Sequence, residues 1–551
     1  MKARFRIVVA DAIAREGLAP LADDPRFDVV ERTGLQDAAL GDALADADAV
    51  LVRSAARITR PVIERATRLR VIGRAGVGVD TIDVDAATEH GIAVLTAPSG
   101  NTTSAAELTI ALMLAVARRI PAADRSMKAG EWDRKRLDGV ELHGKTLGLV
   151  GAGRIGGEVA RRARAFGMTV LAYDPHLAAE RARALEIELL PLDTVLERAD
   201  VLSLHVPLTD ATAGLIGDAQ LGKMKRGAFI VNAARGGVLD EQALVRRLED
   251  GHLGGAALDV FETEPLPPDH PLRRIPSVVL TPHLGASTRE AQQLVAHEIA
   301  DAVRLALLED DLSRAVNAPA IAGEEMRRLR PLLQLAERLG RLLAALVDRP
   351  LERVEVRYAG SVPNVLSTLA ASAIVGALGP VVGREGVNLV SALHLAAARG
   401  IQVVRVGLPA NRDYAEYLEL AAQANGDTRE VAGAVLGAGH ARVVRLGRFH
   451  VDVVPQGWLV ILRNRDVPGV IGRVGTLLGN AGINIGEYHQ SRLEAGGEAL
   501  AAISVDARLP AQLVEGLAAL PEVIELRQVR LNTDDRSNPI GRQGEPRTQH
   551  T

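Results

Sequence analysis

Short apolar runs alternate with amphipathic stretches along the first hundred residues of the chain. The apolar runs predict five strands, over Arg6–Ala10, Phe27–Glu31, Ala49–Val52, Leu69–Gly73 and Ala93–Leu95. The stretches between them, such as 37–45 and 61–68, carry apolar residues at helical spacing. Strands that alternate with helices form parallel sheets with right-handed crossovers. Residues 1–98 are therefore predicted to form a doubly wound α/β lobe.

A glycine-rich turn follows the next predicted strand, which ends at Val150. The spacing Gly151-x-Gly153-x-x-Gly156 leads into a helix that is predicted to run to Phe166. In this pattern the first glycine permits a tight turn, the second lets the backbone approach a pyrophosphate, and the third lets the helix pack on the strand. The helix N-terminus attracts phosphate groups. The turn therefore predicts a dinucleotide site.

The following strand is predicted over 169–173 and ends at Asp174. An acidic residue at this place accepts hydrogen bonds from the ribose hydroxyls and repels a 2′-phosphate. The sequence therefore favours NAD over NADP. Further strands over 200–206, 227–232 and 256–260 continue the same sheet.

Two long helices are predicted to connect this unit to the first lobe. One runs from Ser104 to Arg118, and the spacing of Ser104 and Glu107 is that of a capping box. The other is predicted to begin at a second such pair, Ser287 and Glu290, and to run to about Leu308. A dinucleotide domain over 99–284 would then be inserted into a substrate lobe made of 1–98 and 285–315.

The second half of the chain has a different organisation. Residues 320–452 alternate helices with strands and predict an α+β domain that holds no recognisable chemistry. Residues 457–530 show the order β-α-β-β-α-β of a ferredoxin-like module. Residues 532–551 are polar and rich in Pro, Gly, Arg and Asp, which predicts a disordered tail.

Composition narrows the class of protein. A chain of 551 residues is too long for one core and predicts three or four domains. The 65 basic residues nearly balance 69 acidic ones, so nothing points to nucleic acid. Cysteine is absent, which excludes disulfides, thiolate metal sites and a cysteine nucleophile. No apolar run is long enough for a membrane span, and a cytoplasmic location is expected.

Three residues after the dinucleotide unit suit hydroxy-acid oxidation, which needs a base, a cation and a group that holds the base. Arg235 follows a strand directly and can bind a carboxylate in a bidentate fork, although a surface ion pair would also explain it. His283 lies between a strand and a helix start, where an ordinary loop histidine is the alternative. Glu264 could hold the imidazole and stabilise its charged form, but Glu262 competes with it. His205 and His283 lack a known ligand spacing, so no metal is predicted.

These residues occur within longer motifs that resemble the D-2-hydroxyacid dehydrogenase family. The motifs are Gly73-Arg-Ala-Gly-Val-Gly-Val-Asp80, Gly100-Asn-Thr-Thr-Ser-Ala-Ala-Glu107, Asn232-Ala-Ala-Arg-Gly-Gly237 and Thr281-Pro-His-Leu-Gly-Ala-Ser-Thr288. Residues 320–450 are similar to the intervening domain of the family's long-form branch, and 458–530, with Arg465-Asp466-Val-Pro-Gly469, to an ACT regulatory domain. The resemblance implies two Rossmann-like lobes and NAD-dependent, reversible oxidation of 3-phospho-D-glycerate to 3-phosphooxypyruvate, the first step of serine synthesis. It also implies a homodimer or homotetramer.

The resemblance also assigns residues to roles. His283 would be the acid/base, Glu264 its partner, and Arg235 the carboxylate ligand. Substrate would also contact Arg53, Ser54, Gly76, Gly78 and Asn101, with Arg134 or Lys135 of a neighbouring subunit near the phosphate. Cofactor would contact Val77, Gly151, Gly153, Arg154, Ile155, Gly156, Asp174, Val206, Ala233, Ala234, Arg235, Asp259, His283, Leu284, Gly285 and Ala286. The effector L-serine would contact Asn464, Asp466 and Asn484 in members that serine inhibits.

Two alternative functions are consistent with the same fold. One is a related dehydrogenase acting on 2-hydroxyglutarate, glyoxylate or hydroxypyruvate. The other is a non-catalytic NAD-sensing protein, which would have little need of Arg235, Glu264 and His283 together.

Overall fold

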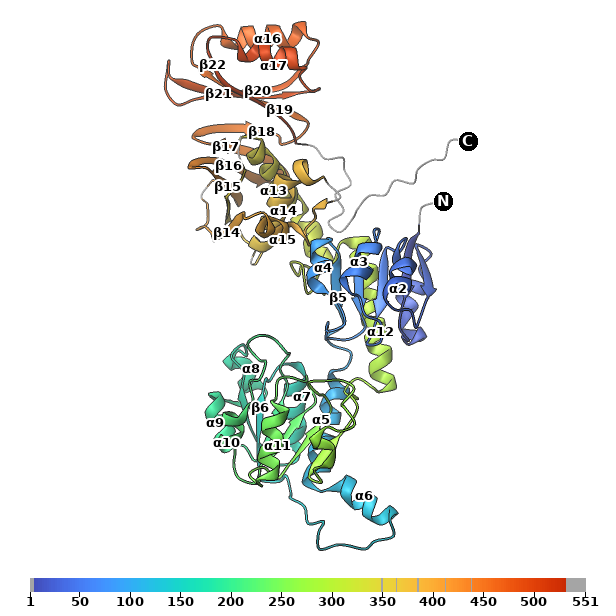
Figure 1. Cartoon of the computed structure of the whole chain (residues 1–551). Helices are drawn as coiled ribbons and strands as arrows, with labels where there is room; N and C mark the ends of the chain where they lie inside the picture. The colour runs from blue at the N-terminus through green and yellow to red at the C-terminus, as the bar shows by residue number, and fades with distance from the viewer. Residues whose placement is uncertain are drawn as a thin grey trace, which may run out of the picture.

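The computed structural model describes residues 4–531 apart from 348, 349, 363, 384, 385, 412 and 438. The polar tail that the sequence predicts over 532–551 lies outside the described residues. The described chain contains four sheets with helices packed on them (Figure 1). Among these residues no helix is both long and apolar enough to cross a membrane.

The first sheet is parallel and has the strand order β2-β1-β3-β4-β5. Its strands are β1 (Phe5–Val9), β2 (Phe27–Glu31), β3 (Ala49–Val52), β4 (Val71–Arg74) and β5 (Ala93–Thr96). Its helices are η1 (Arg15–Leu18), α1 (Ala19–Ala22), α2 (Asp37–Leu44), α3 (Arg60–Arg65) and α4 (Val84–Glu89). Strand β2 is added on one side of β1, and β3 to β5 are added on the other side, so the strand order reverses between β1 and β3. Open α/β sheets bind ligands at such a point.

Helix α12 (Arg289–Glu309) returns to this first sheet from far along the chain (Figure 1). Its buried residues Val295, Ile299 and Val303 share one apolar cluster with Ile7 and Leu51 of the sheet. The first sheet and α12 therefore share one core, although they come from distant parts of the chain.

The second sheet is also parallel, with the order β12-β11-β10-β9-β6-β7-β8. Its strands are β6 (Thr146–Val150), β7 (Thr169–Tyr173), β8 (Glu188–Leu189), β9 (Val201–Leu204), β10 (Phe229–Asn232), β11 (Gly255–Leu258) and β12 (Val278–Leu280). Its helices are α5 (Thr102–Ala117), α6 (Ile120–Lys128), α7 (Arg154–Ala165), α8 (Ala179–Ala184), α9 (Leu192–Arg198), α10 (Asp218–Lys223), α11 (Glu241–Glu249) and η2 (Pro271–Arg274). The strand order reverses between β6 and β9, so the glycine-rich turn after β6 lies at the switch point.

Both predicted capping boxes are wrong. Helix α5 begins at Thr102, so Ser104 lies inside its first turn, and its hydroxyl is 2.6 Å from the Thr288 hydroxyl. The N-cap of α12 is Thr288, one residue later than predicted, and its hydroxyl accepts the Ala291 N–H at 3.1 Å. The N-cap of α5 is Asn101, whose side chain makes no capping hydrogen bond.

The third sheet is mixed, with the order β14-β13-β15-β16-β17-β18, and only its β13–β14 pair is parallel. Its strands are β13 (Arg353–Ala359), β14 (Gln402–Gly407), β15 (Glu416–Ala424), β16 (Asp427–Leu436), β17 (His440–Leu446) and β18 (Phe449–Val453). Helices α13 (Gly323–Ala345), α14 (Leu366–Val382) and α15 (Ala392–Ala398) pack with it.

The fourth sheet has the order β20-β21-β19-β22. Its strands are β19 (Trp458–Arg465), β20 (Ile485–Arg492), β21 (Glu498–Val505) and β22 (Val523–Arg530). Helices α16 (Val470–Asn480) and α17 (Ala511–Ala518) contribute Val474, Leu478 and Leu517 to one apolar cluster with the sheet. This arrangement confirms the predicted ferredoxin-like module.

Candidate active site

The glycine-rich turn has the open geometry that a pyrophosphate requires. Gly151 has φ +91°, and a Cβ there would lie 2.6 Å from the His205 carbonyl oxygen, so only glycine fits. A Cβ on Gly153 would meet no atom within 4 Å, which leaves the space above the turn free. A Cβ on Gly156 would lie 2.3 Å from the Gly151 carbonyl oxygen, so α7 packs directly on the turn. The residues present therefore fit a dinucleotide.

Asp174 lies at the end of β7, beside this turn. One carboxylate oxygen accepts the Ala152 N–H and the other accepts the His176 N–H, each at 2.9 Å. These bonds fix the carboxylate at the mouth of the turn, while each oxygen keeps a lone pair for a ribose hydroxyl. Arg154 and Ile155 begin α7, and the Val206 side chain lies under Gly151.

His283 and Glu264 form a hydrogen-bonded pair. The His283 Nδ1 is 2.7 Å from a Glu264 carboxylate oxygen, and both side chains are partly exposed. The other Glu264 oxygen accepts the Phe261 N–H at 3.1 Å, which fixes the carboxylate. Glu262 instead accepts the Glu241 N–H at 3.4 Å. The structure therefore places Glu264, rather than Glu262, against the imidazole.

Asp259 holds the turn that carries His283. Its side chain is fully buried, and it accepts hydrogen bonds from the Leu284 N–H at 2.7 Å, the Gly285 N–H at 3.0 Å and the Thr281 hydroxyl at 2.6 Å. Burial raises the pKa of this carboxyl above its usual value. His283 has φ +54°, a conformation that this network and its own N–H bond to the Asp259 carbonyl maintain.

Arg235 contacts both lobes. It follows β10, and its Nη1 donates to the Ala234 carbonyl at 2.6 Å. A Cβ added to Gly78, in the loop after β4 of the other lobe, would lie 2.6 Å from the Arg235 Nη2. On its own lobe, Gly236 packs so closely on the Phe261 carbonyl that a Cβ would lie 1.9 Å from that oxygen. Arg235 thus lies between the Gly76–Gly78 loop and the turn that carries Glu264.

The charge around Arg235 is strongly positive. Burial, together with the positive charge of Arg235, lowers the pKa of Arg74 to about 10. The Arg74 Nε is buried without a hydrogen-bond partner in the described part of the chain. Arg53 adds a third guanidinium on the same side. Asp80, 3.9 Å from Arg235, is the nearest acid to that group. Such a surplus of cations suits an anionic substrate.

Two carboxylates that were not predicted from the sequence support loops of the first lobe. Asp11 is buried and accepts the backbone N–H groups of Arg53 at 2.6 Å and Ala56 at 2.9 Å. Glu298 of α12 accepts the N–H groups of Ser99 and Gly100, both at 3.0 Å. The adjoining Asn101 has its side-chain oxygen buried without a partner among the described residues. The signal for Asp11 was an acid directly after the first strand. Glu298 offered no signal, because its partners are 199 and 198 residues away in sequence.

His205 is half-buried, and its backbone carbonyl lies against Gly151 of the glycine-rich turn. Its ring nitrogen is 2.9 Å from the Ser203 hydroxyl, and burial lowers its pKa to about 4. No group of three or more histidine or acidic side chains in the described part of the chain could hold a metal ion.

The remaining predicted residues lie apart from this site. Arg134 and Lys135 are exposed in the segment that follows α6, which extends away from the second sheet (Figure 1). Asn464, at the end of β19, is fully buried and donates to the Arg465 carbonyl at 2.7 Å. Asp466 contacts Arg492 at 3.2 Å, and Asn484 donates to Asp506 at 3.0 Å. Asn464 and Asp466 therefore lie at the end of the fourth sheet where β21 begins, whereas Asn484 lies at the opposite end, where β21 finishes. Within one chain the three proposed effector contacts are not brought together.

Comparisons with known proteins cover nearly the whole chain. Residues 110–285 match the D-isomer specific 2-hydroxyacid dehydrogenase NAD binding domain, 328–447 the D-3-phosphoglycerate dehydrogenase intervening domain, and 458–522 the ACT domain. The chain is 40% identical over 528 residues to proteins named D-3-phosphoglycerate dehydrogenase from Methanocaldococcus jannaschii and Bacillus subtilis, covering 96% of this chain and 100% of each relative. It also resembles a crystal structure of NAD-dependent formate dehydrogenase from Staphylococcus aureus in complex with NAD, at 30% identity and TM-score 0.50, covering 55% of this chain and 96% of that one.

Proposed function

The chain belongs to the D-2-hydroxyacid dehydrogenase family, in its D-3-phosphoglycerate dehydrogenase branch, and we propose that it oxidises 3-phospho-D-glycerate to 3-phosphooxypyruvate with NAD. The observation that carries this proposal is the hydrogen-bonded His283–Glu264 pair. The turn that carries Glu264 packs on Gly236, next to Arg235, and the guanidinium groups of Arg53 and Arg74 add positive charge there. Relatives that align with 96% of the chain at 40% identity are named for this activity, which disfavours the two alternatives raised by the sequence.

His283 is the proton acceptor. An ionised carboxylate only accepts hydrogen bonds, so Glu264 requires a proton on Nδ1 and leaves Nε2 with its lone pair. Nε2 then takes the proton of the substrate C2 hydroxyl as the carbonyl forms. The imidazolium that results faces the Glu264 carboxylate, which stabilises its charge. In the reverse reaction the same group returns the proton.

Arg235 binds the C1 carboxylate of the substrate and orients C2. NAD, when bound, supplies the acceptor for the C2 hydride. Gly151, Gly153 and Gly156 give the pyrophosphate its backbone cradle, and Asp174 selects the unphosphorylated ribose. The other predicted cofactor contacts remain part of this proposal.

Substrate comparison tests the proposal. The kcat/KM for NAD reduction is measured with 3-phospho-D-glycerate and with D-2-hydroxyglutarate, which lacks the phosphate. We expect a preference of at least about 100-fold for the phosphorylated acid, which corresponds to roughly two charge-assisted hydrogen bonds. Equal or reversed preference would reassign the chain to another 2-hydroxy acid.

Regulation and assembly are part of the same proposal. The matched ACT domain supports regulation by a small ligand, and Asn464, Asp466 and Asn484 are the proposed contacts for L-serine. NADH production measured with and without L-serine tests this, and an unchanged rate excludes serine as the effector. A homodimer or homotetramer and a cytoplasmic location stay predictions, the former testable by light scattering.

A further inference from the structure

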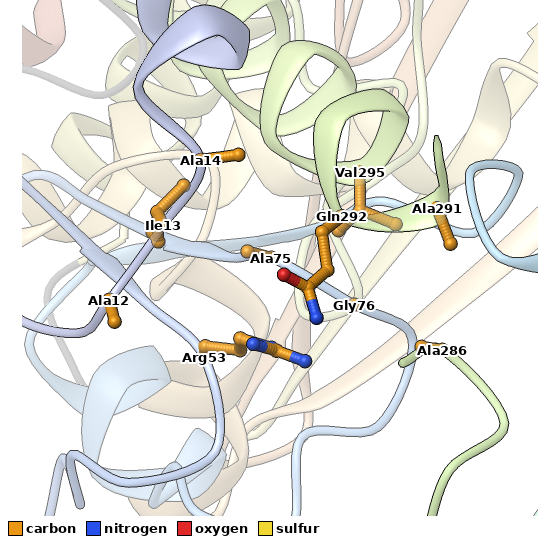
Figure 2. Close-up of a pocket in the computed structure, with 10 residues that line it drawn as sticks. All are labelled: Ala12, Ile13, Ala14, Arg53, Ala75, Gly76, Ala286, Ala291, Gln292 and Val295. Carbon is orange, nitrogen blue, oxygen red and sulfur yellow. The ribbon is translucent and has the colours of Figure 1, made fainter. Parts of the chain in front are cut away.

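A pocket beside the cleft contains a polar side chain that no role above explains. Its walls come from the loop after β1 (Ala12, Ile13 and Ala14), the loops after β3 and β4, and the first turns of α12 (Figure 2). Gln292 of α12 and Arg53 both extend their polar ends into it (Figure 2). Neither the Arg53 guanidinium nor the Gln292 carboxamide makes a hydrogen bond or ion pair with another described residue. Two strong donors thus face one space without partners.

The position of this pocket relative to the reacting groups identifies which end of the substrate it would hold. Gly76 and Ala286 line its inner side. Gly76 is two residues from Gly78, which touches Arg235, and Ala286 is three residues from His283. The pocket therefore begins where the C1 and C2 groups of the substrate are bound. Arg53 and Gln292 extend their polar ends into the space between these two residues and the Ala12–Ala14 loop (Figure 2).

We propose that Gln292 is a specificity-determining residue, whose carboxamide donates to the phosphate of the substrate while Arg53 neutralises its charge. This inference rests on the proposed function and extends it to a residue outside the predicted site. The pocket walls Ile13, Val295 and Ala14 are apolar, so they strengthen an anion's contacts with both donors by excluding water. A neutral donor also suits this place, because Arg53, Arg74 and Arg235 already repel one another.

Asp11 pre-organises the pocket, because it holds the backbone of the loop that carries Arg53. Its buried carboxylate accepts a hydrogen bond from the Arg53 backbone N–H at 2.6 Å. It therefore positions the loop of Arg53 without presenting its charge to the phosphate. Gln292 lies one turn beyond Thr288, the N-cap of α12, on the longest helix of this lobe. The backbone of both donors is thus held in place, by Asp11 and by α12.

The test compares 3-phosphooxypyruvate with hydroxypyruvate, which differ only in the phosphate, in the NADH-consuming direction. The variants are Gln292→Ala, Gln292→Glu and the matched control Gln293→Ala, which changes the next glutamine of α12, a residue that does not line the pocket. We expect Gln292→Ala to lower kcat/KM for 3-phosphooxypyruvate by about 10- to 100-fold through KM, with hydroxypyruvate turnover within about 2-fold. Gln292→Glu should lose more than Gln292→Ala, because its charge repels the phosphate.

The outcomes separate this inference from the proposed function. A wild-type enzyme that fails to turn over 3-phosphooxypyruvate refutes the proposed function itself. If the wild type is active and Gln292→Ala retains its KM, the role of Gln292 is refuted. An equal loss with both ketoacids, or an equal loss in Gln293→Ala, shows a general effect on α12 and also overturns the assignment. Unchanged melting temperatures exclude misfolding as the cause of any loss.

Discussion

Replacing Gly78 with alanine perturbs the active site through one contact between the two lobes. The added Cβ would lie 2.6 Å from the Arg235 Nη2 and 2.6 Å from an Asp80 carboxylate oxygen, about 0.8 Å short of an ordinary 3.4 Å contact. Gly78 is outside the left-handed region, so alanine adopts its backbone without strain. The neighbours are the ends of flexible side chains, and the guanidinium must therefore move while the fold is kept.

A displacement of this size is large for bidentate recognition of a carboxylate. Misplacing a binding group by about 1 Å costs roughly 100-fold in rate. We therefore expect Gly78→Ala to lower kcat/KM for 3-phospho-D-glycerate by about 10- to 100-fold, or about 1.4 to 2.7 kcal/mol. NADH affinity, measured by fluorescence titration, should be retained, because the glycine-rich cradle lies elsewhere.

A control substitution shows whether loss of any glycine has the same effect. Gly475 lies inside α16, and a Cβ there would meet no atom within 4 Å. Gly475→Ala should leave catalysis unchanged and stabilise the protein by about 0.5 to 1 kcal/mol. Gly78→Ala with wild-type kcat/KM and an unchanged melting temperature would refute the close contact between Gly78 and Arg235.

Three further substitutions test other parts of the account. Glu264→Gln keeps the size of the side chain but removes the charge that stabilises the imidazolium, so kcat should fall by about 10²- to 10³-fold; a loss confined to KM would contradict this role. Asp174→Ser removes the acid that repels a 2′-phosphate, so the ratio of kcat/KM for NAD over NADP should fall at least about 10-fold, and an unchanged ratio would place cofactor selection elsewhere. Burial raises the pKa of Asp310 to about 6 from a usual 3.8. The folded protein therefore binds this proton more tightly than the unfolded chain, and it loses up to about 3 kcal/mol of stability as the pH rises from 4 to 6. Asp310→Asn, which tolerates the φ of +58°, should therefore raise the melting temperature at pH 8 and leave it unchanged at pH 4; the same gain at both values would contradict the titration.

The sequence predicted the two parallel sheets because their signals are local. A strand that ends at Val150, three spaced glycines and an acid at the next strand end are all read within 30 residues. The helix starts failed for the opposite reason. Thr288 competes with its neighbour Ser287 for the same cap, and the contact between Thr288 and Ser104 comes from a distant helix.

Site residues could be predicted only where the sequence immediately around them forms a recognisable pattern. Arg235 and His283 follow strands and precede turns, which marks them in the sequence. The choice of Glu264 over Glu262 needed coordinates, because both follow the same strand at similar distance. Asp11 was not predicted because the loop it supports is remote in sequence. Gln292 was not predicted because a glutamine within a helix carries no signal of its own.

The most direct test of the central claim is the effect of His283→Ala on turnover and on cofactor binding in the same preparation. The measurement is steady-state NADH formation from 3-phospho-D-glycerate, together with the Kd for NADH. Loss of the proton acceptor should lower kcat by about 10²- to 10⁴-fold and leave the Kd within about 2-fold of the wild-type value. Turnover at the wild-type rate in this variant would contradict the assignment of His283 as the base.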